Sequence, residues 1–320
     1  MPVTILREGH VRSLISMSDA LAAVESSFKE QSAGTGINLP RHRVHQPNGT
    51  LHLMGAALSQ RGYWGFKAYT ATRNGVRFSI NLYDGNTGEL LAILEADYIG
   101  QLRTGAASGI ATKYLVKNGA SKLALLGSGS QAATQLAAIA AVVNLQEVRV
   151  YSRNPDHRAA FARQMSATLG INIQPVDTPA QAVSDCDILT TITTSSTPVF
   201  SGSDLPAGVH INAAGSNSVS RTELDLETIK RVDLFFTDDY DQAKLECGDL
   251  IHAYERNVFN WSRLHLLADV ISGKLTGRTS PADITLFESH GIALWDIALA
   301  AEVYDRARDA KLGTEIDFGE

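Results

Sequence analysis

The chain has 320 residues, of which 44% are hydrophobic and 19% are charged, and this size and composition allow two globular domains with a large core. The net charge is -6 and no basic run occurs, so nucleic acid is not an expected partner. No signal peptide and no apolar stretch long enough to span a membrane is visible, so we expect no membrane partner and a cytoplasmic location. Cys186 and Cys247 are expected to be reduced thiols.

The first hundred residues predict a helix followed by a mostly antiparallel sheet. Residues 18–33 have apolar side chains at helical spacing. The spacing then changes to a period of two, which predicts strands at 51–54, 63–69, 79–83 and 90–94. Residues 98–116 predict a second helix that is dense in glycine, alanine and serine. Because glycine weakens a helix, we expect another backbone or a cofactor to approach it closely.

From Leu123 onward, strands and helices alternate along the chain. Strands are predicted at 123–126, 147–151, 172–175, 187–193, 209–214, 234–236 and 284–289. Helices are predicted at 131–143, 158–169, 178–184 and 291–310. This alternation predicts a parallel, doubly wound sheet, and we expect the last helix to rejoin the first domain. The fold class is therefore α/β, with a Rossmann-type sheet and a second, mixed α/β domain.

A glycine turn joins the first strand of this alternating region to its first helix. It reads Gly127-Ser128-Gly129-Ser130-Gln131-Ala132, a G-x-G-x-x-A motif within a strand–turn–helix–strand unit of about thirty residues. Gly127 permits the tight turn, Gly129 lets a pyrophosphate approach the backbone, and Ala132 allows close packing of helix on strand. The positive helix start suits a phosphate. The motif predicts dinucleotide binding by Gly127, Gly129, Ser130, Gln131 and Ala132, against the alternative of a plain tight turn.

The end of the next strand predicts which dinucleotide binds. NAD-preferring domains usually carry an acidic residue there, whereas NADP-binding domains use arginine. Here the strand ends in Ser152 and Arg153, with Arg158 nearby. We therefore expect these three residues to bind the cofactor, NADPH to be preferred, and NADH to be used to some extent.

Several short motifs occur in order along the chain. They are Leu39-Pro40-Arg41, His52-Leu53-Met54, Gly65-Phe66-Lys67, Tyr83-Asp84 with Thr87-Gly88-Glu89, Leu102-Arg103-Thr104-Gly105-Ala106-Ala107, the glycine turn, Asn212-Ala213-Ala214-Gly215-Ser216, Thr222-Glu223-Leu224-Asp225 and Phe287-Glu288-Ser289-His290-Gly291. In their order and spacing they resemble the ornithine cyclodeaminase and mu-crystallin family over nearly the whole chain. The resemblance implies a homodimer with a substrate-binding and dimerisation domain, 1–116 plus 291–320, and a Rossmann domain, 117–290. It also implies cofactor contacts from Thr104 and Ser289.

The resemblance implies that Arg41, Lys67 and Arg103 bind a substrate carboxylate, which suits the bidentate geometry of arginine and the point charge of lysine. From the residues alone, Lys67 could equally face solvent, Arg103 could form a surface salt bridge, and Arg43 could replace Arg41. Lys67 is also the nearest plausible proton donor to an imine.

Other polar residues are harder to place. His52 is either a donor in the substrate pocket or a satisfied core histidine, and His290 is either near the nicotinamide or on the surface. The nine histidines form no i, i+4 pair with a carboxylate between them, so no metal is expected.

Asn217 stands where, by the resemblance, cyclodeaminases and alanine dehydrogenases carry a catalytic aspartate. An amide cannot accept and return the protons that ammonia elimination requires. The alternative is that Asn217 is a turn residue and that Asp225 or Asp296 acts as the base.

Together these features predict an NAD(P)H-dependent reductase of small α-imino acids that gives an L-amino acid, with a cyclic ketimine such as pyrroline-2-carboxylate as substrate. The alternatives are an iminosuccinate reductase or alanine-type amino acid dehydrogenase, an ornithine cyclodeaminase, or a non-catalytic nucleotide- or hormone-binding protein.

Overall fold

A computed structural model describes residues 2–317 of the chain. Its contacts divide the chain into two compact units. Unit 1 comprises residues 2–103 and 292–317, and unit 2 comprises residues 104–291. The first boundary lies between Arg103 and Thr104, inside helix α3 (Asp97–Leu115), whereas the sequence places it after that helix at residue 116. The difference arises because one continuous helix supplies residues to both units.

Unit 1 is built on one eight-stranded sheet, with the order β16-β1-β7-β6-β5-β4-β2 and with β3 paired to β4. Its strands are β1 (Val3–Leu6), β2 (Gly36–Asn38), β3 (His42–Gln46), β4 (Gly49–Leu58), β5 (Tyr63–Thr72), β6 (Gly75–Asp84), β7 (Leu90–Glu95) and β16 (Thr314–Ile316). Every pairing is antiparallel except β1 with β7. The antiparallel meander from β4 to β7 is as predicted. The short strands β1 and β16 escaped the sequence analysis because they show no clear alternation.

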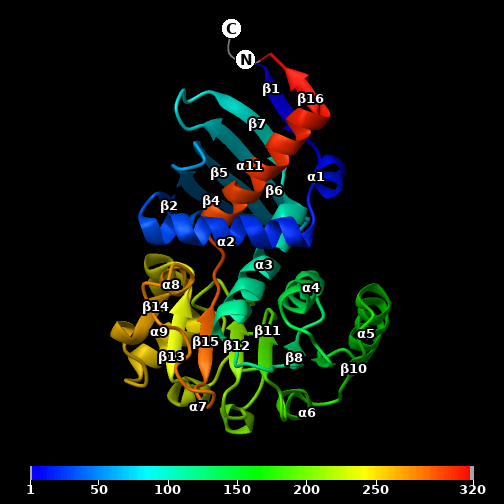
Figure 1. Ribbon diagram of the computed structural model, residues 1–320, viewed down its shortest axis with the longest axis vertical. Helices are drawn as coiled ribbons and strands as arrows, with labels where there is room; N and C mark the ends of the chain where they lie inside the picture. The colour runs from blue at the N-terminus through cyan, green and yellow to red at the C-terminus, as the bar shows by residue number, and fades with distance from the viewer. Residues whose placement is uncertain (1, 318–320) are drawn as a thin grey trace. The chain divides into compact units, whose positions relative to one another are not determined.

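Three helices belong wholly to unit 1: α1 (Glu8–Leu14), α2 (Met17–Ala33) and α11 (Ala293–Ala310). At the start of helix α2, the hydroxyl of the N-cap residue Ser16 accepts a hydrogen bond from the Asp19 amide. At its end, Gly34 adopts the left-handed conformation and caps the helix. Helix α11 runs across β4, β5 and β6 and packs on α2 (Figure 1). Its Trp295 is fully buried against the edge of Phe28, with ring centroids 5.3 Å apart. This helix therefore covers one face of the sheet.

Unit 2 contains a second eight-stranded sheet, all parallel, with the order β10-β9-β8-β11-β12-β15-β13-β14. Its strands are β8 (Lys122–Leu126), β9 (Glu147–Tyr151), β10 (Ile173–Pro175), β11 (Ile188–Thr191), β12 (His210–Ala213), β13 (Leu234–Thr237), β14 (Leu264–Leu266) and β15 (Thr285–Glu288). The order reverses between β8 and β11, which is the switch point of a doubly wound sheet. The predicted fold class is confirmed.

Seven α-helices lie wholly in unit 2 (residues 104–291), and all but the last contribute side chains to its two apolar core clusters. They are α4 (Ala132–Val142), α5 (Pro155–Leu169), α6 (Pro179–Val183), α7 (Leu226–Arg231), α8 (Tyr240–Glu246), α9 (Gly248–Glu255) and α10 (Leu267–Ile271). A side chain at Gly105 of α3 would place its Cβ 2.3 Å from the Thr134 carbonyl oxygen of α4. The expected close backbone approach to the glycine-rich helix is therefore confirmed. No helix among the described residues is long and apolar enough to cross a membrane.

Candidate active site

Unit 1 holds a buried ion-pair cluster around Lys67. The register places Lys67 of β5 beside Met54 of β4, on the sheet face that α11 covers, and only 1% of the lysine is exposed. Its Nζ atom donates to Asp296 Oδ1 at 2.9 Å, and Arg103 Nε lies 3.3 Å from the same oxygen. Asp296 is fully buried in the first turn of α11. The burial of Lys67 excludes the alternative in which it faces solvent.

This environment changes the proton affinity of Lys67. Burial lowers its pKa to about 8, because the charged form loses its hydration. The Asp296 carboxylate opposes this shift, whereas the positive charges of Arg103 and Arg41 add to it. A lysine with a pKa near 8 holds a proton at neutral pH and gives it up more readily than an ordinary lysine.

Arg41 follows β2 and is only 5% exposed, and its Nε atom lies 3.3 Å from the Met54 Sδ atom. Its neighbour Arg43 is less buried, on β3. Of the two arginines between which the sequence could not choose, Arg41 is therefore the one in the interior. Its charge acts on Lys67 together with that of Arg103. Three cations and Asp296 thus share one region of unit 1.

His52 lies on the same sheet face as Lys67, since it pairs with Tyr69 two residues farther along β5. The two rings stack with centroids 4.1 Å apart and an interplanar angle of 4°. Burial, followed by the charges of Arg43 and Arg41, lowers the pKa of His52 to about 4, so the ring is neutral at pH 7. Its buried Nδ1 atom has no hydrogen-bond partner among the described residues. A neutral ring with an unsatisfied nitrogen favours the alternative in which His52 forms a hydrogen bond in the substrate pocket over the alternative of a core histidine whose hydrogen bonds are satisfied.

The glycine turn of unit 2 has the geometry that dinucleotide binding requires. Gly127 has φ +125°, and a Cβ there would lie 2.4 Å from the Ile192 carbonyl oxygen, so only glycine fits. At Gly129 a Cβ would meet nothing within 4 Å, which leaves the backbone open to a ligand. Ala132 begins α4, and no side chain caps that helix start at Gln131. Ser130 is exposed beside it. These residues fit a pyrophosphate at the start of α4.

A pocket of about 390 Å³ opens beside this turn, at the carboxyl ends of β8, β9 and β11. The residues that line it include the glycines of the turn, Ser152, Arg153, His157 and the segment 192–195. The Ser128 and Ser152 hydroxyls are 2.8 Å apart. No aspartate or glutamate is among the described residues that line the pocket. His157, in the first turn of α5, was missed by the sequence analysis because the motif ends before it.

Arg158 has a different place from the one expected. It is buried and does not line this pocket; its guanidinium donates to the Ser152 carbonyl oxygen at 3.0 Å and forms an ion pair with Asp177. We therefore revise its expected role from a phosphate ligand to a residue that holds the backbone of Ser152 in place. Arg153 is left as the arginine that lines the pocket.

The remaining expected cofactor residues are also in unit 2. The Thr104 carbonyl oxygen accepts from Gln135 Nε2 at 3.1 Å. The Ser289 amide donates to the Ala213 carbonyl oxygen at 2.9 Å, and its buried hydroxyl has no hydrogen-bond partner among the described residues. Asn217 is half-buried in the loop after β12.

The two alternative bases are both held by other groups. Asp225 caps α7, and its carboxylate accepts hydrogen bonds from the Thr228 amide at 2.7 Å and from the Gly202 amide at 3.0 Å. Asp296 pairs with Lys67 and Arg103. Each carboxylate is therefore already engaged by neighbouring groups of its own unit.

Unit 2 also buries carboxyl groups that the sequence analysis did not single out: Glu223, Asp238, Asp249 and Glu288. Glu223 accepts from the Thr193 amide and hydroxyl, the Thr191 hydroxyl and the Gly215 amide, at 2.6–2.9 Å. It therefore fixes the loops that follow β11 and β12. Burial raises the pKa of all four groups, to about 7 for Asp238 and Asp249. His290 is buried among them, so its surface alternative is wrong.

Comparisons with known proteins agree with this architecture. The model of the ornithine cyclodeaminase/mu-crystallin family matches residues 3–311. An alanine dehydrogenase from Archaeoglobus fulgidus is 35% identical, over 99% of each chain. The structure of Thermococcus litoralis Delta(1)-pyrroline-2-carboxylate reductase with NADH and L-proline is similar at a TM-score of 0.94 and 33% identity, over 98% of this chain and 100% of that one. An archaeal alanine dehydrogenase dimer with bound NAD has a TM-score of 0.94 and 34% identity over the full length of both chains. The chain belongs to the ornithine cyclodeaminase/mu-crystallin family.

Proposed function

We propose that the protein is an NAD(P)H-dependent reductase of small α-imino acids, with cyclic ketimines such as pyrroline-2-carboxylate as its substrate class and an L-amino acid as product. The observation that carries this proposal is a buried cluster in which Lys67 and Arg103 share Asp296 and the charge of the buried Arg41 acts on Lys67. Lys67 and Arg103 share the single carboxylate of Asp296, which leaves one positive charge that a substrate carboxylate would neutralise. A protein that only bound a nucleotide would have no use for this cluster.

The cluster would orient the substrate. An arginine guanidinium grips a carboxylate with two parallel hydrogen bonds, and a lysine adds a point charge. With the carboxylate fixed, the imine carbon adjacent to it has one orientation, and such positioning supplies a large part of the rate enhancement. A bound NAD(P)H supplies the hydride.

Reduction of an imine also requires a proton at the nitrogen, and Lys67 would supply it. Its pKa of about 8 keeps Nζ protonated at neutral pH, while burial weakens its hold on that proton. Asp296 would keep the lysine oriented through its 2.9 Å hydrogen bond. His52, which is neutral at pH 7, would add a hydrogen bond to the substrate without changing the charge of the pocket.

We propose that NADPH is preferred and that NADH is also used. The relatives named above bind NADH or NAD. In this chain the pocket beside the glycine turn carries Ser152, Arg153 and His157, and no acidic residue lines it among residues 2–317. A 2′-phosphate would therefore meet the Ser152 hydroxyl and the Arg153 guanidinium, whereas the described lining residues include no acid to recognise a 2′-hydroxyl.

A homodimer is part of the same proposal. The strand register places Ile37, Val44, Leu51, Leu53 and Trp64 on one sheet face of unit 1, opposite the face that α11 covers. Each of these apolar side chains is exposed by 36% or more. Contiguous exposed apolar residues typically mark an interface, and the archaeal alanine dehydrogenase is a dimer. The mass of the protein in solution, measured by light scattering, tests this point against 34.4 kDa for one chain.

The main test is a cofactor-oxidation assay over a panel of substrates. The panel holds cyclic α-imino acids, iminosuccinate, and pyruvate with ammonia, each with NADPH and with NADH. Fastest turnover of a cyclic α-imino acid supports the proposal. Fastest turnover of pyruvate with ammonia, or of iminosuccinate, would assign the rival dehydrogenase or reductase activity. Tight cofactor binding with no turnover across the panel would instead support a binding protein.

Asn217 separates the proposal from an ornithine cyclodeaminase. We expect the wild-type protein to release no ammonia from ornithine with catalytic NAD, because an amide at this position cannot carry a proton between steps. Ammonia release at a rate comparable to imine reduction would contradict this expectation. The variant Asn217→Asp provides the complementary test, since appearance of ammonia release would assign the missing proton carrier to this position.

A further inference from the structure

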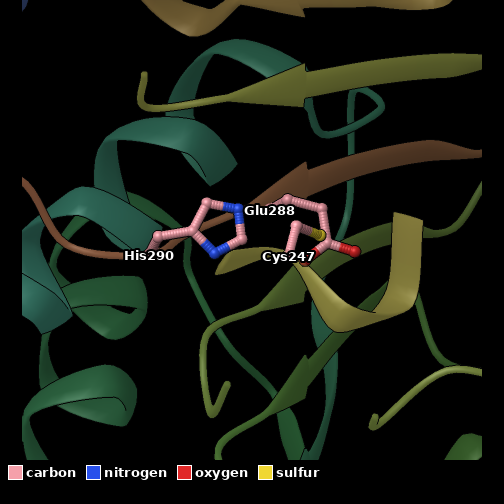
Figure 2. A group of neighbouring side chains, drawn as sticks. All are labelled: Cys247, Glu288 and His290. Carbon is pink, nitrogen blue, oxygen red and sulfur yellow. The ribbon is translucent and has the colours of Figure 1, made fainter. Parts of the chain in front are cut away.

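Three side chains with different donor atoms converge in the interior of unit 2, as Figure 2 shows. Cys247 stands at the junction of α8 and α9, Glu288 ends β15, and His290 follows in the next loop. The Cys247 Sγ atom, a Glu288 carboxylate oxygen and a His290 ring nitrogen lie within 4.8 Å of one another. All three residues are at most 4% exposed.

The Glu288 carboxyl group hydrogen-bonds with the Cys247 thiol but is only partly satisfied. Its Oε1 atom is buried and has no hydrogen-bond partner among the described residues. An unsatisfied buried polar atom costs roughly 1–3 kcal/mol, so a partner for it is expected. The carboxyl groups of Asp249, Glu223 and Asp238 are close enough to act on Glu288 electrostatically. In the part of the chain that the structure describes, no lysine or arginine forms an ion pair with Glu288, and a cation would relieve this crowding.

We propose that Cys247, Glu288 and His290 bind a divalent transition-metal ion of the zinc class. Sulfur, imidazole nitrogen and carboxylate oxygen are the donors that zinc takes in proteins, whereas magnesium and calcium take oxygen alone. A tetrahedral ion with bonds of about 2.0–2.3 Å holds its ligand atoms roughly 3.3–3.6 Å apart. The present separations, all within 4.8 Å, need only small side-chain rotations to reach that geometry.

The three protein ligands leave one tetrahedral position for water. The ion would tie the α8–α9 junction to the end of β15, and so would stabilise the folded form over the unfolded one. This inference departs from the sequence-based expectation of no metal. That expectation considered only ligands at short spacing in a helix, whereas these residues meet through the fold.

The test uses the purified full-length protein after treatment with a chelator. We expect Co²⁺ to bind at one ion per chain and to give visible d–d bands with sulfur-to-cobalt charge-transfer absorption in the near ultraviolet. Zn²⁺ should displace the Co²⁺ and raise the melting temperature. These readouts do not depend on activity, so they are independent of the proposed imine reduction.

Variants assign the ligands. Cys247→Ser should remove the charge-transfer band, and Cys186→Ser is the matched control, because Cys186 is also a buried free thiol but lies outside the group. His290→Gln should weaken Co²⁺ binding by roughly a hundredfold or more, and circular dichroism establishes that it remains folded. A protein that binds no Co²⁺ saturably, or whose charge-transfer band survives Cys247→Ser, would overturn the proposal.

Discussion

Both units of this protein bury charged groups, but they stabilise them in different ways. In unit 1, Lys67 and Arg103 share one oxygen of Asp296, at 2.9 and 3.3 Å. In unit 2, Glu223 accepts four hydrogen bonds from backbone and hydroxyl groups and has no ion-paired cation among the described residues. The first arrangement leaves positive charge for an anionic ligand. The second holds in place the loops that follow β11 and β12. Burial of charge therefore serves architecture in unit 2, whereas in unit 1 we propose that it serves binding.

The largest effect is expected from breaking the ion-pair cluster at its centre. Asp296→Asn removes the counter-charge of two buried cations, and breaking a buried pair in this way typically costs about 3–5 kcal/mol of unfolding free energy. Denaturant unfolding measures the loss. Asp309→Asn is the control, since this acid lies on the same helix but is exposed. Equal stability of the two variants would show that Asp296 does not hold the cluster.

The same variant should shift the pH dependence of imine reduction. The Asp296 carboxylate raises the pKa of Lys67 against the effect of burial, so its removal lowers that pKa further below about 8. If protonated Lys67 is needed, activity falls as the pH rises through that pKa, and the falling limb of kcat/KM moves to lower pH in Asp296→Asn. A falling limb at unchanged pH would separate Lys67 from the proton transfer.

Removing either cation should cost nearly as much in catalysis. Lys67→Ala and Arg103→Ala are each expected to lose about 2–5 kcal/mol of transition-state stabilisation, the scale for truncating a buried charge pair. This corresponds to a decrease in kcat/KM of roughly 30- to 5,000-fold. Cofactor affinity should change much less in Lys67→Ala, and the exposed Lys29→Ala is the control. Near-normal turnover of Lys67→Ala would place the substrate elsewhere.

A smaller effect is expected at Glu223 of unit 2. Glu223→Gln replaces one acceptor oxygen by an amide donor that faces the donors of Thr191, Thr193 or Gly215. We expect a loss of about 1–3 kcal/mol in unfolding free energy and weaker cofactor binding, because Thr193 lines the nucleotide pocket. Glu227→Gln, on the exposed side of α7, is the control. Cofactor titration by fluorescence tests this, and an unchanged affinity would confine Glu223 to stability alone.

The smallest effect is expected at Ser152, where no buried charge is broken. Ser152→Asp places a carboxylate in the pocket beside the glycine turn, where it repels a 2′-phosphate and accepts from a 2′-hydroxyl. We expect the ratio of kcat/KM for NADPH over NADH to fall roughly 10- to 150-fold, which corresponds to about 1.5–3 kcal/mol, the scale of one charged hydrogen bond. A wild-type protein that already prefers NADH would contradict the assignment of this pocket.

Whether a structural feature could be predicted from the sequence depends on how far apart in the sequence its residues lie. The glycine turn, the alternation of strands and helices, and the period-two strands are local patterns, and the structure confirms the fold that they predict. The pairing of Lys67 with Asp296 joins residues 229 positions apart, and no local pattern reports it. The hydrogen bonds of Glu223 and the meeting of Cys247 with Glu288 and His290 were missed for the same reason. Arg158 illustrates the opposite error, since its position in sequence indicated a ligand although its guanidinium binds Ser152 and Asp177.

The central claim is that Lys67 and the neighbouring cations bind the substrate carboxylate. A double-change cycle, in which the lysine and the substrate carboxylate are removed singly and together, tests this claim most directly. It compares kcat/KM for pyrroline-2-carboxylate and for pyrroline without the carboxylate, in the wild-type protein and in Lys67→Ala. We predict that the wild-type protein prefers the carboxylated imine, and that Lys67→Ala reduces this preference by about 2 kcal/mol or more, roughly 30-fold. An equal preference in both proteins would contradict the account, because Lys67 would then contribute nothing to recognition of the carboxylate.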